Sequence, residues 1–217
     1  MARSAKTAVE AVLSRREEIL AIAARVIAER GIAGATVRDI GQAAGILSGS
    51  LYYHFDSKEQ IVLELLLPSV QAHHDDCVAI LAARTNAVQA LEELIRSSVD
   101  QAATHAHQSV ILRNEASTFR DVALLAPIAE LRRKSLALWI GLLDRGIEAG
   151  EFRSDIDIDV AVHAMFDGVL GVSRWFREEN GSTTKVVADT LIEMYVSIRG
   201  PTSVDSCNCT AALSGPC

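Results

Sequence analysis

Residues 36–58, TVRDIGQAAGILSGSLYYHFDSK, constrain the fold of this chain more than any other stretch. Thr36 is a favoured N-cap of a helix, and Asp39, three residues later, can return a hydrogen bond to the cap. Apolar residues then recur at helical spacing as far as Ala44. Gly45 follows and allows a turn, because glycine adopts a positive φ angle without strain. The sequence therefore predicts a short helix that ends near residue 44 in a tight turn.

A second short helix is expected directly after this turn. Ser48 is predicted to cap it, and Leu51, Tyr52 and Phe55 lie along it. A further helix is expected to start at Ser57. Two helices joined by a short turn that contains glycine are a common device for placing the second helix in the major groove of DNA. Two short amphipathic helices of an ordinary core have the same spacing, so the spacing alone leaves both interpretations open.

The side chains of the second helix favour the DNA interpretation. Its first three residues are small, so backbone N–H groups at the helix N-terminus can approach a phosphate. The Tyr-Tyr-His run that follows can donate hydrogen bonds, and a nearby lysine can neutralise a phosphate. The predicted DNA-binding residues are Thr36, Arg38, Ser48, Gly49, Ser50, Tyr52, Tyr53, His54 and Lys58.

The segment TVRDIGQAAGILSGSLYYHFDSKEQIV resembles the DNA-binding signature of the TetR family of transcriptional regulators. The resemblance rests on Thr36, the Ala-Ala-Gly turn, Gly49, the run from Leu51 to Phe55 and the Ser-Lys-Glu that follows. It implies an all-α protein that binds a double-stranded palindromic operator as a homodimer and is released by a small molecule. Many members of the family carry Ser followed by Lys or Arg where this chain has Leu47-Ser48, so one basic contact with DNA is absent.

Composition and charge agree with an all-α regulator. Only 5% of the residues are aromatic and only four are proline, a composition more typical of helices than of sheets. The net charge of −7 is unevenly distributed. Residues 1–58 contain eight Lys and Arg against six Asp and Glu, whereas the rest of the chain contains thirteen against twenty-two. We therefore expect the N-terminal part to accept DNA and the acidic remainder to repel it.

The helical pattern predicts an N-terminal three-helix helix-turn-helix DNA-binding domain at residues 9–56. Its first helix is expected to start with a capping box at Ser14 and to end at Gly31. Residues 57–200 are predicted to form a helical ligand-binding and dimerisation domain, and residues 201–217 a disordered tail. The helices expected in the second domain span residues 57–81 with a kink at Pro68, 86 onward, 108–116, 127–149, 157–179 and 183–199, with a loop at 117–121.

The last two predicted helices have broad apolar faces. Small residues, among them Ala164, Gly168 and Gly171, permit close approach of another helix, as in a four-helix dimer interface. The TetR resemblance implies that this same pair forms the homodimer. The sequence contains no apolar stretch that could span a membrane and no signal-peptide core, so we expect a cytoplasmic protein without a membrane partner.

A small-molecule site is expected in the second domain. The run Arg174-Trp175-Phe176-Arg177 combines two guanidinium groups with two aromatic rings, which suits a ligand that is phosphorylated and partly aromatic. A helix end that pairs with neighbouring glutamates would have the same sequence. The predicted ligand-binding residues are Asn114, Glu115, Trp139, Arg174, Trp175 and Arg177, for which core or surface roles are the alternative.

Three segments, AGILSGSLYYHF, LWIGLLDRGIEAGEFRSDIDIDV and VSRWFR, together resemble a TetR subgroup. Members of this subgroup repress sterol (cholesterol) catabolism and are released by a CoA thioester of a degraded ring intermediate. The resemblance implies that Arg174 and Trp175 meet the CoA moiety and that Asn114, Glu115 and Trp139 lie near the acyl pocket. A CoA-free apolar metabolite or drug is the alternative effector, and it would need neither Arg174 nor Arg177.

Several histidine, aspartate and cysteine residues raise the alternative of a metal-dependent enzyme. The runs His73-His74-Asp75-Asp76-Cys77 and His105-x-His107 contain metal-ligand types, but no second helix carries a matching pair at the required spacing. Cys207-x-Cys209 lacks the spacing of a zinc site. We therefore expect no enzymatic activity, no metal and no cofactor. A metal-dependent helical enzyme remains the least favoured alternative.

Overall fold

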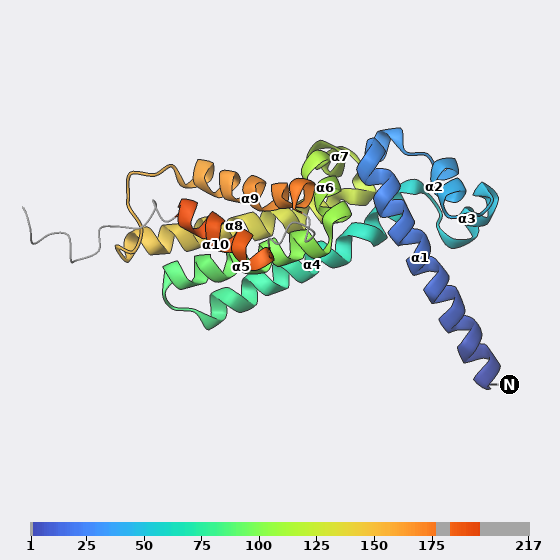
Figure 1. The fold of residues 1–217 in the computed structure, drawn as a ribbon, viewed down its shortest axis with the longest axis horizontal. Coiled ribbons are helices and arrows are strands. Elements are labelled where there is room, and N and C mark those ends of the chain that lie inside the picture. The colour runs from blue at the N-terminus through green and yellow to red at the C-terminus, as the bar shows by residue number, and fades with distance from the viewer. Residues whose placement is uncertain (1, 177–182, 196–217) are drawn as a thin grey trace, which may run out of the picture.

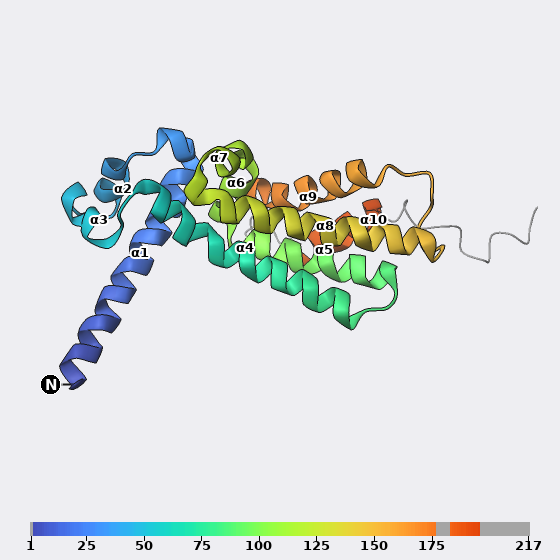
Figure 2. The same ribbon diagram turned by 180° about the vertical axis from the view of Figure 1, so that it is seen from behind.

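The computed structural model describes residues 2–176 and 183–195. Figures 1 and 2 show an elongated arrangement of helices, with a small head at one end and a larger body. No β-strand occurs in the described ranges, which confirms the predicted all-α fold. The elements are α1 (Ala2–Gly34), α2 (Val37–Ala43), α3 (Ser48–His54), α4 (Lys58–Ala83), α5 (Ala87–Thr104), α6 (Ala106–Asn114), α7 (Ala116–Asp121), η1 (Ala123–Leu125), α8 (Ala126–Glu148), α9 (Ile158–Trp175) and α10 (Thr184–Tyr195).

Helix α1 is longer than predicted. It begins at Ala2 rather than at Ser14, and its N-terminal half projects away from the head (Figure 1). Gly31 interrupts the helix where the sequence predicts its end, with a non-helical φ of 75° and ψ of 163°, and the chain bends there before a final turn to Gly34. Only glycine readily occupies this region of φ and ψ. The bend places the final turn of α1 at the junction between the head and the body.

The turn chemistry of the helix-turn-helix is confirmed. The Thr36 hydroxyl accepts a hydrogen bond from the Asp39 N–H at 3.1 Å, and the Asp39 carboxylate accepts one from the Thr36 N–H at 2.9 Å. The Thr36 hydroxyl also donates to this carboxylate, and that bond contributes most to lowering the pKa of Asp39. Gly45 has a φ of 66°, as its place in the turn requires.

The predicted N-cap of α3 is wrong by one residue. Leu47, not Ser48, is the N-cap of α3, and Ser48 is the first helical residue. Leu47 has no side-chain oxygen, so no side chain caps the helix there. The turn already positions the chain through the Ile46 N–H, which donates to the Gly41 carbonyl at 2.9 Å.

One hydrophobic core joins the head to the near end of the body. Buried residues of α1 to α3 and of the first half of α4 belong to it, as do Ile111, Phe119, Leu125, Ile128 and Leu131 of the body. The predicted domain boundary after residue 56 therefore runs through a core that both parts share. Because this core is closely packed, a displacement of α6, α7 or α8 would also displace residues of the head.

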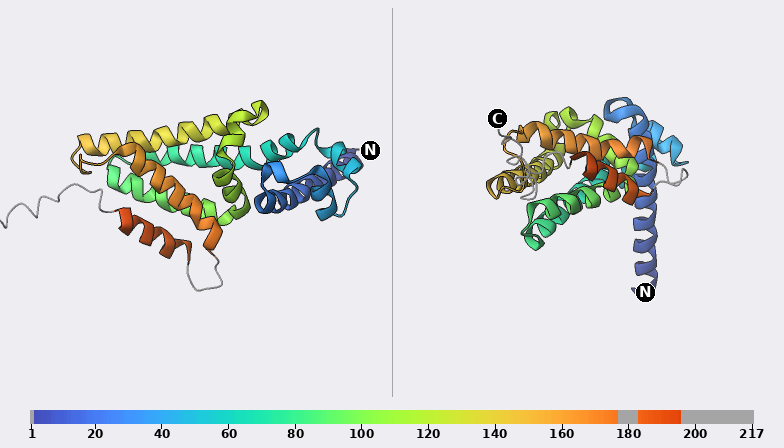
Figure 3. Two further views of the ribbon diagram at one scale, coloured as in Figure 1. Left: turned by 90° about the horizontal axis from the view of Figure 1, so that it is seen from above. Right: turned by 60° about the vertical axis from the view of Figure 1, so that its left-hand side comes forward.

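A second core fills the rest of the body. Figure 3 shows α4, α5, α8 and α9 running lengthwise through it. Helix α4 packs against α8, and α5 packs against α9 and α10. A Cβ added at Gly146 would lie 2.2 Å from the Phe152 ring, so α8 approaches this ring more closely than alanine would allow.

Helix α4 runs through Pro68 as one element, and the kink expected there stays a prediction. Two further predictions about the body need correction. Residues 117–121, expected as a loop, belong to helix α7, because this segment buries Phe119 in the shared core. Helix α9 ends at Trp175 rather than at residue 179, and Phe176, its C-cap, has extended backbone angles. The expected C-terminal tail and the end of the last helix lie outside the described residues.

Candidate functional site

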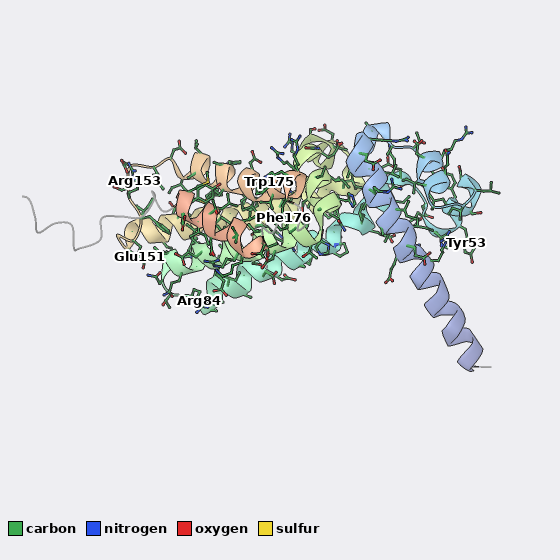
Figure 4. All side chains as sticks on the ribbon, in the orientation of Figure 1. Tyr53, Arg84, Glu151, Arg153, Trp175 and Phe176 are labelled. Carbon is green, nitrogen blue, oxygen red and sulfur yellow. The ribbon has the colours of Figure 1, made fainter. Side chains whose placement is uncertain are left out.

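Helix α3 presents its polar face and both tyrosines at the outer end of the head. Leu51 is 1% exposed and anchors the helix in the core, whereas Tyr52 is 57% and Tyr53 is 84% exposed. Figure 4 shows Tyr53 projecting from this end, far from the body. Gly49 and Ser50 are also exposed. Exposed aromatic rings on a short helix, with small residues before them, form the surface expected of a DNA-reading helix.

Arg16 of α1 holds this helix in place. Its guanidinium makes two hydrogen bonds to the Glu64 carboxylate, at 3.0 Å and 2.6 Å, and donates to the His54 carbonyl at the end of α3. It also lies 4.3 Å from the centroid of the Phe55 ring. Burial raises the pKa of Glu64, but the hydrogen bonds from Arg16 and Gln60 and the charge of Arg16 together outweigh it, and the net shift is downward.

Arg16 was not among the predicted site residues. A signal for it exists in the sequence, because Arg16 lies three residues before Ile19, on the face of α1 that enters the core. A basic residue on a buried face usually has a specific partner. The partner itself, Glu64, is 48 residues away in the chain and has no local signature.

Lys58 has partners inside the protein. Its ammonium donates to the carbonyls of Ile32 at 2.6 Å and Ala35 at 3.1 Å, which ties the start of α4 to the end of α1. Thr36 likewise serves the capping box. These contacts give both residues a structural role, and their contact with DNA stays a prediction. Arg38 is exposed near the start of α2, and Ser48 and His54 are partly buried at the two ends of α3.

The body contains a cavity of about 60 Å³ bounded by α4, α5, α6, α8 and α9. Apolar side chains from all five helices line it, together with polar side chains from α4, α5, α6 and α8. The lining residues are Ser69, Val70, His73, Ser98, Gln101, Ala102, His105, Gln108, Ser109, Leu112, Arg132, Ser135, Trp139, Phe166, Val169 and Leu170. A mostly apolar cavity with a few polar groups is the usual form of a small-molecule site.

Trp139 is the predicted ligand residue that lines this cavity. Its ring is 1% exposed and makes an edge contact with Phe166, with the ring centroids 5.0 Å apart. Its indole N–H has no hydrogen-bond partner among the described residues, although it lies close enough to the Cys77 thiol to influence it. Burial raises the pKa of that thiol to about 11, and the indole N–H acts in the opposite direction.

Asn114 and Glu115 do not line the cavity, and their contact with an effector stays a prediction. Asn114 is exposed at the end of α6. The Glu115 carboxylate accepts a hydrogen bond from the Ile32 N–H at 3.0 Å and another from the Thr118 hydroxyl at 2.7 Å. Glu115 therefore connects the body to the last turn of α1, directly after the bend at Gly31.

Arg174 and Trp175 are exposed in the last turn of α9, and Trp175 is 60% exposed. Neither lines the cavity. Leu170, one turn before Arg174 on the same face of the helix, does line it. Figure 4 shows Trp175 on the body. Arg177 lies outside the described residues.

His73 is held neutral on the cavity wall. Burial lowers its pKa to about 4, Asp76 opposes this shift, and His74 and Arg132 add to it. A histidine whose pKa is lower in the folded than in the unfolded state destabilises the fold as the pH falls below its unfolded pKa of 6.5. We predict that the free energy of unfolding falls by about 2 kcal/mol more in the wild type than in His73→Gln between pH 7 and pH 5.

Urea unfolding at these two pH values measures this difference. Loss of stability from protonated carboxylates, such as Glu64, is common to both proteins and cancels in the comparison. Equal losses in the two proteins would show that His73 is not held neutral in the fold.

In residues 2–176 and 183–195, no group of three or more His, Cys, Asp and Glu side chains could hold a metal ion. Within the same ranges, no helix is both long and apolar enough to cross a membrane.

Comparison with known proteins identifies the fold and the family. Residues 19–65 match the family described as "Bacterial regulatory proteins, tetR family", and residues 84–198 match "Tetracyclin repressor-like, C-terminal domain". The chain is 40% identical over 185 residues to the HTH-type transcriptional repressor KstR2 of Rhodococcus jostii (strain RHA1), covering 85% of this chain and 88% of the relative. It is 37% identical over 190 residues to KstR2 of Mycobacterium tuberculosis (strain H37Rv), covering 86% and 92%.

The structural comparison agrees. The structure of the ketosteroid transcriptional regulator KstR2 of Mycobacterium tuberculosis superimposes with a TM-score of 0.80 at 33% identity, over 87% of this chain and 96% of the other. The two matched segments together cover the helix-turn-helix and the helical body. The protein is a regulator of transcription and not an enzyme. The chain belongs to the TetR family of bacterial regulatory proteins and is a DNA-binding transcriptional repressor of that family.

Proposed function

We propose that this repressor acts as a homodimer on a palindromic operator and leaves it when an acyl-CoA thioester binds the body. In this proposal, residues 9–56 bind DNA, residues 57–200 dimerise and sense the effector, and the protein works in the cytoplasm, where operator DNA lies. The observation that carries the effector assignment is the position of Arg174 and Trp175, one helical turn beyond the lining of the cavity.

The surface of α9 and α10 supports the dimer. Val160 on α9 is 64% exposed, and Val186 and Met194 on α10 are 53% and 65% exposed. Val186 and Met194 are eight residues apart and therefore lie on one face of α10. Exposed apolar side chains on both helices suit a four-helix interface between two copies. A two-fold axis there would present two recognition helices to a palindrome.

The residues that we assign to the DNA contact are the exposed ones of the head. Tyr52, Tyr53, Gly49 and Ser50 present the outer surface of α3, and Arg38 lies beside it. The other predicted contacts, Thr36, Ser48, His54 and Lys58, would reach DNA through groups that also stabilise the head.

The end of α9 supports recognition of CoA. A guanidinium binds phosphate oxygens through paired N–H donors, and an exposed indole offers a flat face for stacking on an adenine ring. Leu170, one turn earlier, would lie beside the acyl group within the cavity. The relative from Mycobacterium tuberculosis is described as a ketosteroid regulator. AibR, with the same fold at 22% identity and a TM-score of 0.71, has been solved with isovaleryl coenzyme A and operator DNA.

The size of the cavity supports a mechanism of release. A cavity of about 60 Å³ holds only a few water molecules, whereas sites for larger ligands occupy about 300–1,000 Å³. An acyl group must therefore move the helices that bound the cavity. One of them, α6, ends at Glu115, which bonds to α1. A ligand that binds only the expanded arrangement shifts the population toward it, and the operator is released if that arrangement fits DNA poorly.

A CoA-free apolar effector is the second candidate. The apolar part of the cavity lining favours it, because the side chains of Trp139, Phe166 and Val169 carry no charge that would bind a phosphate. Such a ligand would occupy the same cavity without contacting Arg174.

Thermal unfolding with isovaleryl-CoA, decanoyl-CoA and the two free acids tests the effector class. A ligand at a hundredfold excess over its dissociation constant stabilises the folded protein by roughly 2.7 kcal/mol. We expect a higher midpoint with a thioester but not with its acid, and loss of this shift in Arg174→Ala. The matched control Arg133→Ala removes an exposed arginine of α8 and should keep the shift. A shift that Arg174→Ala retains would contradict the CoA assignment.

A further inference from the structure

Arg132 is a partly buried cation that lines the cavity. One guanidinium N–H donates to the Leu112 carbonyl, and the guanidinium carbon lies 5.9 Å from the centroid of the Phe119 ring. No carboxylate of the described chain lies within ion-pair distance of it. Burial lowers the pKa of Arg132, and the more distant Asp167 carboxylate opposes this shift.

A second donor faces the same cavity without a partner. Ser98 of α5 is 6% exposed and lines the cavity, and its hydroxyl makes no hydrogen bond within the described residues. A buried hydroxyl without a partner destabilises the protein, because it has lost its hydrogen bonds to water. Arg132 has five N–H donors, of which the described structure satisfies one. Both groups would gain from an acceptor oxygen on a ligand.

We propose that Arg132 and Ser98 form an oxygen-binding subsite, which takes a carbonyl or carboxylate oxygen carried by the apolar acyl body of the effector. This inference rests on the proposed effector cavity and adds the class of acyl group that fills it. A plain hydrocarbon chain would leave both donors without partners. An acyl group with an oxygen away from its thioester would satisfy them, and such discrimination between ligands is strong because it depends on buried polar groups.

The subsite also lies at the connection between the cavity and the head. Leu112 is in the last turn of α6, where carbonyl groups have no partner within the helix. Arg132 supplies that partner for Leu112. Three residues later, Glu115 accepts the Ile32 N–H of α1. An acceptor oxygen that draws Arg132 toward the cavity would compete with the Leu112 carbonyl and loosen the end of α6 that holds the head.

Calorimetric binding of two ten-carbon thioesters, decanoyl-CoA and 9-oxodecanoyl-CoA, tests the subsite, with CoA-free 2-undecanone as a third probe. We expect the wild type to bind the oxo thioester at least tenfold more tightly than decanoyl-CoA. Arg132→Met should lose this preference and bind decanoyl-CoA at least as well as the wild type does. Arg133→Met is the matched control and should keep the preference. Ser98→Ala, which changes the fold least, should reduce the preference.

Equal affinity of the wild type for the two thioesters would overturn the subsite, as would a preference that survives in Arg132→Met. Binding of 2-undecanone that depends on Arg132, without binding of either thioester, would support the subsite and refute the CoA effector. Failure of all three probes to bind at millimolar concentration would refute both the subsite and the effector cavity for acyl ligands of this length. Hydrogen exchange at the Ile32 amide should accelerate with the oxo thioester in the wild type and not in Arg132→Met.

Discussion

Replacing Tyr52 and Tyr53 together by alanine is expected to weaken operator binding by at least about 100-fold. Each lost contact at a DNA interface costs about 1–3 kcal/mol, and each 1.4 kcal/mol is a factor of ten in affinity. The proposed dimer brings two heads to the operator, so the loss occurs twice. Both rings are mostly exposed, and the residues that anchor α3, Leu51 and Phe55, stay in the core. The fold should therefore survive the change.

Fluorescence anisotropy with a palindrome that the wild type selects from random DNA measures this effect. Circular dichroism checks that the double variant remains helical. Replacing both residues by phenylalanine keeps the rings and removes the hydroxyls, and so separates ring contacts from hydrogen bonds. Unchanged affinity of the alanine variant would place the DNA contact elsewhere on the head.

Replacing Gly31 by alanine is expected to lower the free energy of unfolding by about 2–4 kcal/mol and to disturb the connection between the head and the body. Alanine is strained at φ 75° and ψ 163°, which glycine alone readily adopts. Its Cβ would also lie 2.8 Å from a Glu115 carboxylate oxygen, the oxygen that accepts the Ile32 N–H. Relief of this contact requires Glu115 to move away from α1. Chemical denaturation measures the stability, and hydrogen exchange at the Ile32 amide measures the lost bond.

Gly34 provides the matched control, three residues later in the same helix. A Cβ there would meet only the Arg30 Cβ, at an ordinary 3.8 Å, and the backbone is not in the left-handed region. Gly34→Ala should therefore be neutral or stabilise the protein by about 0.4–1 kcal/mol. Similar effects of the two substitutions would refute the special role assigned to the bend.

The helix-turn-helix could be predicted because its signals are local. The capping box of Thr36 and Asp39 spans three residues, and the positive φ of Gly45 follows from the turn itself. The apolar spacing of the body likewise predicted most of its helices. The cap of α3 was misassigned by one residue, because the turn and the preceding helix determine where that helix starts, not the preference of Ser48 for caps.

The connections between the head and the body could not be predicted in this way. Glu115 bonds to Ile32 across 83 residues of sequence, and Arg16 reaches Glu64 across 48. A single sequence contains no record of such pairs. Arg132 likewise resembles its exposed neighbour Arg133 in the sequence, and only the packing of α8 against α4 and α5 separates a cavity residue from a surface one. The cavity is therefore a product of tertiary structure.

The central claim is that a ligand bound in the body controls the affinity of the head for operator DNA. The most direct measurement is displacement of a fluorescently labelled operator from the wild-type protein by a panel of acyl-CoA thioesters, run beside the matching free acids. We expect at least one thioester, and none of the acids, to lower the fraction of bound operator, and Arg174→Ala to require a much higher concentration of it. A bound operator that persists while calorimetry shows the thioester bound in the body would contradict the claim.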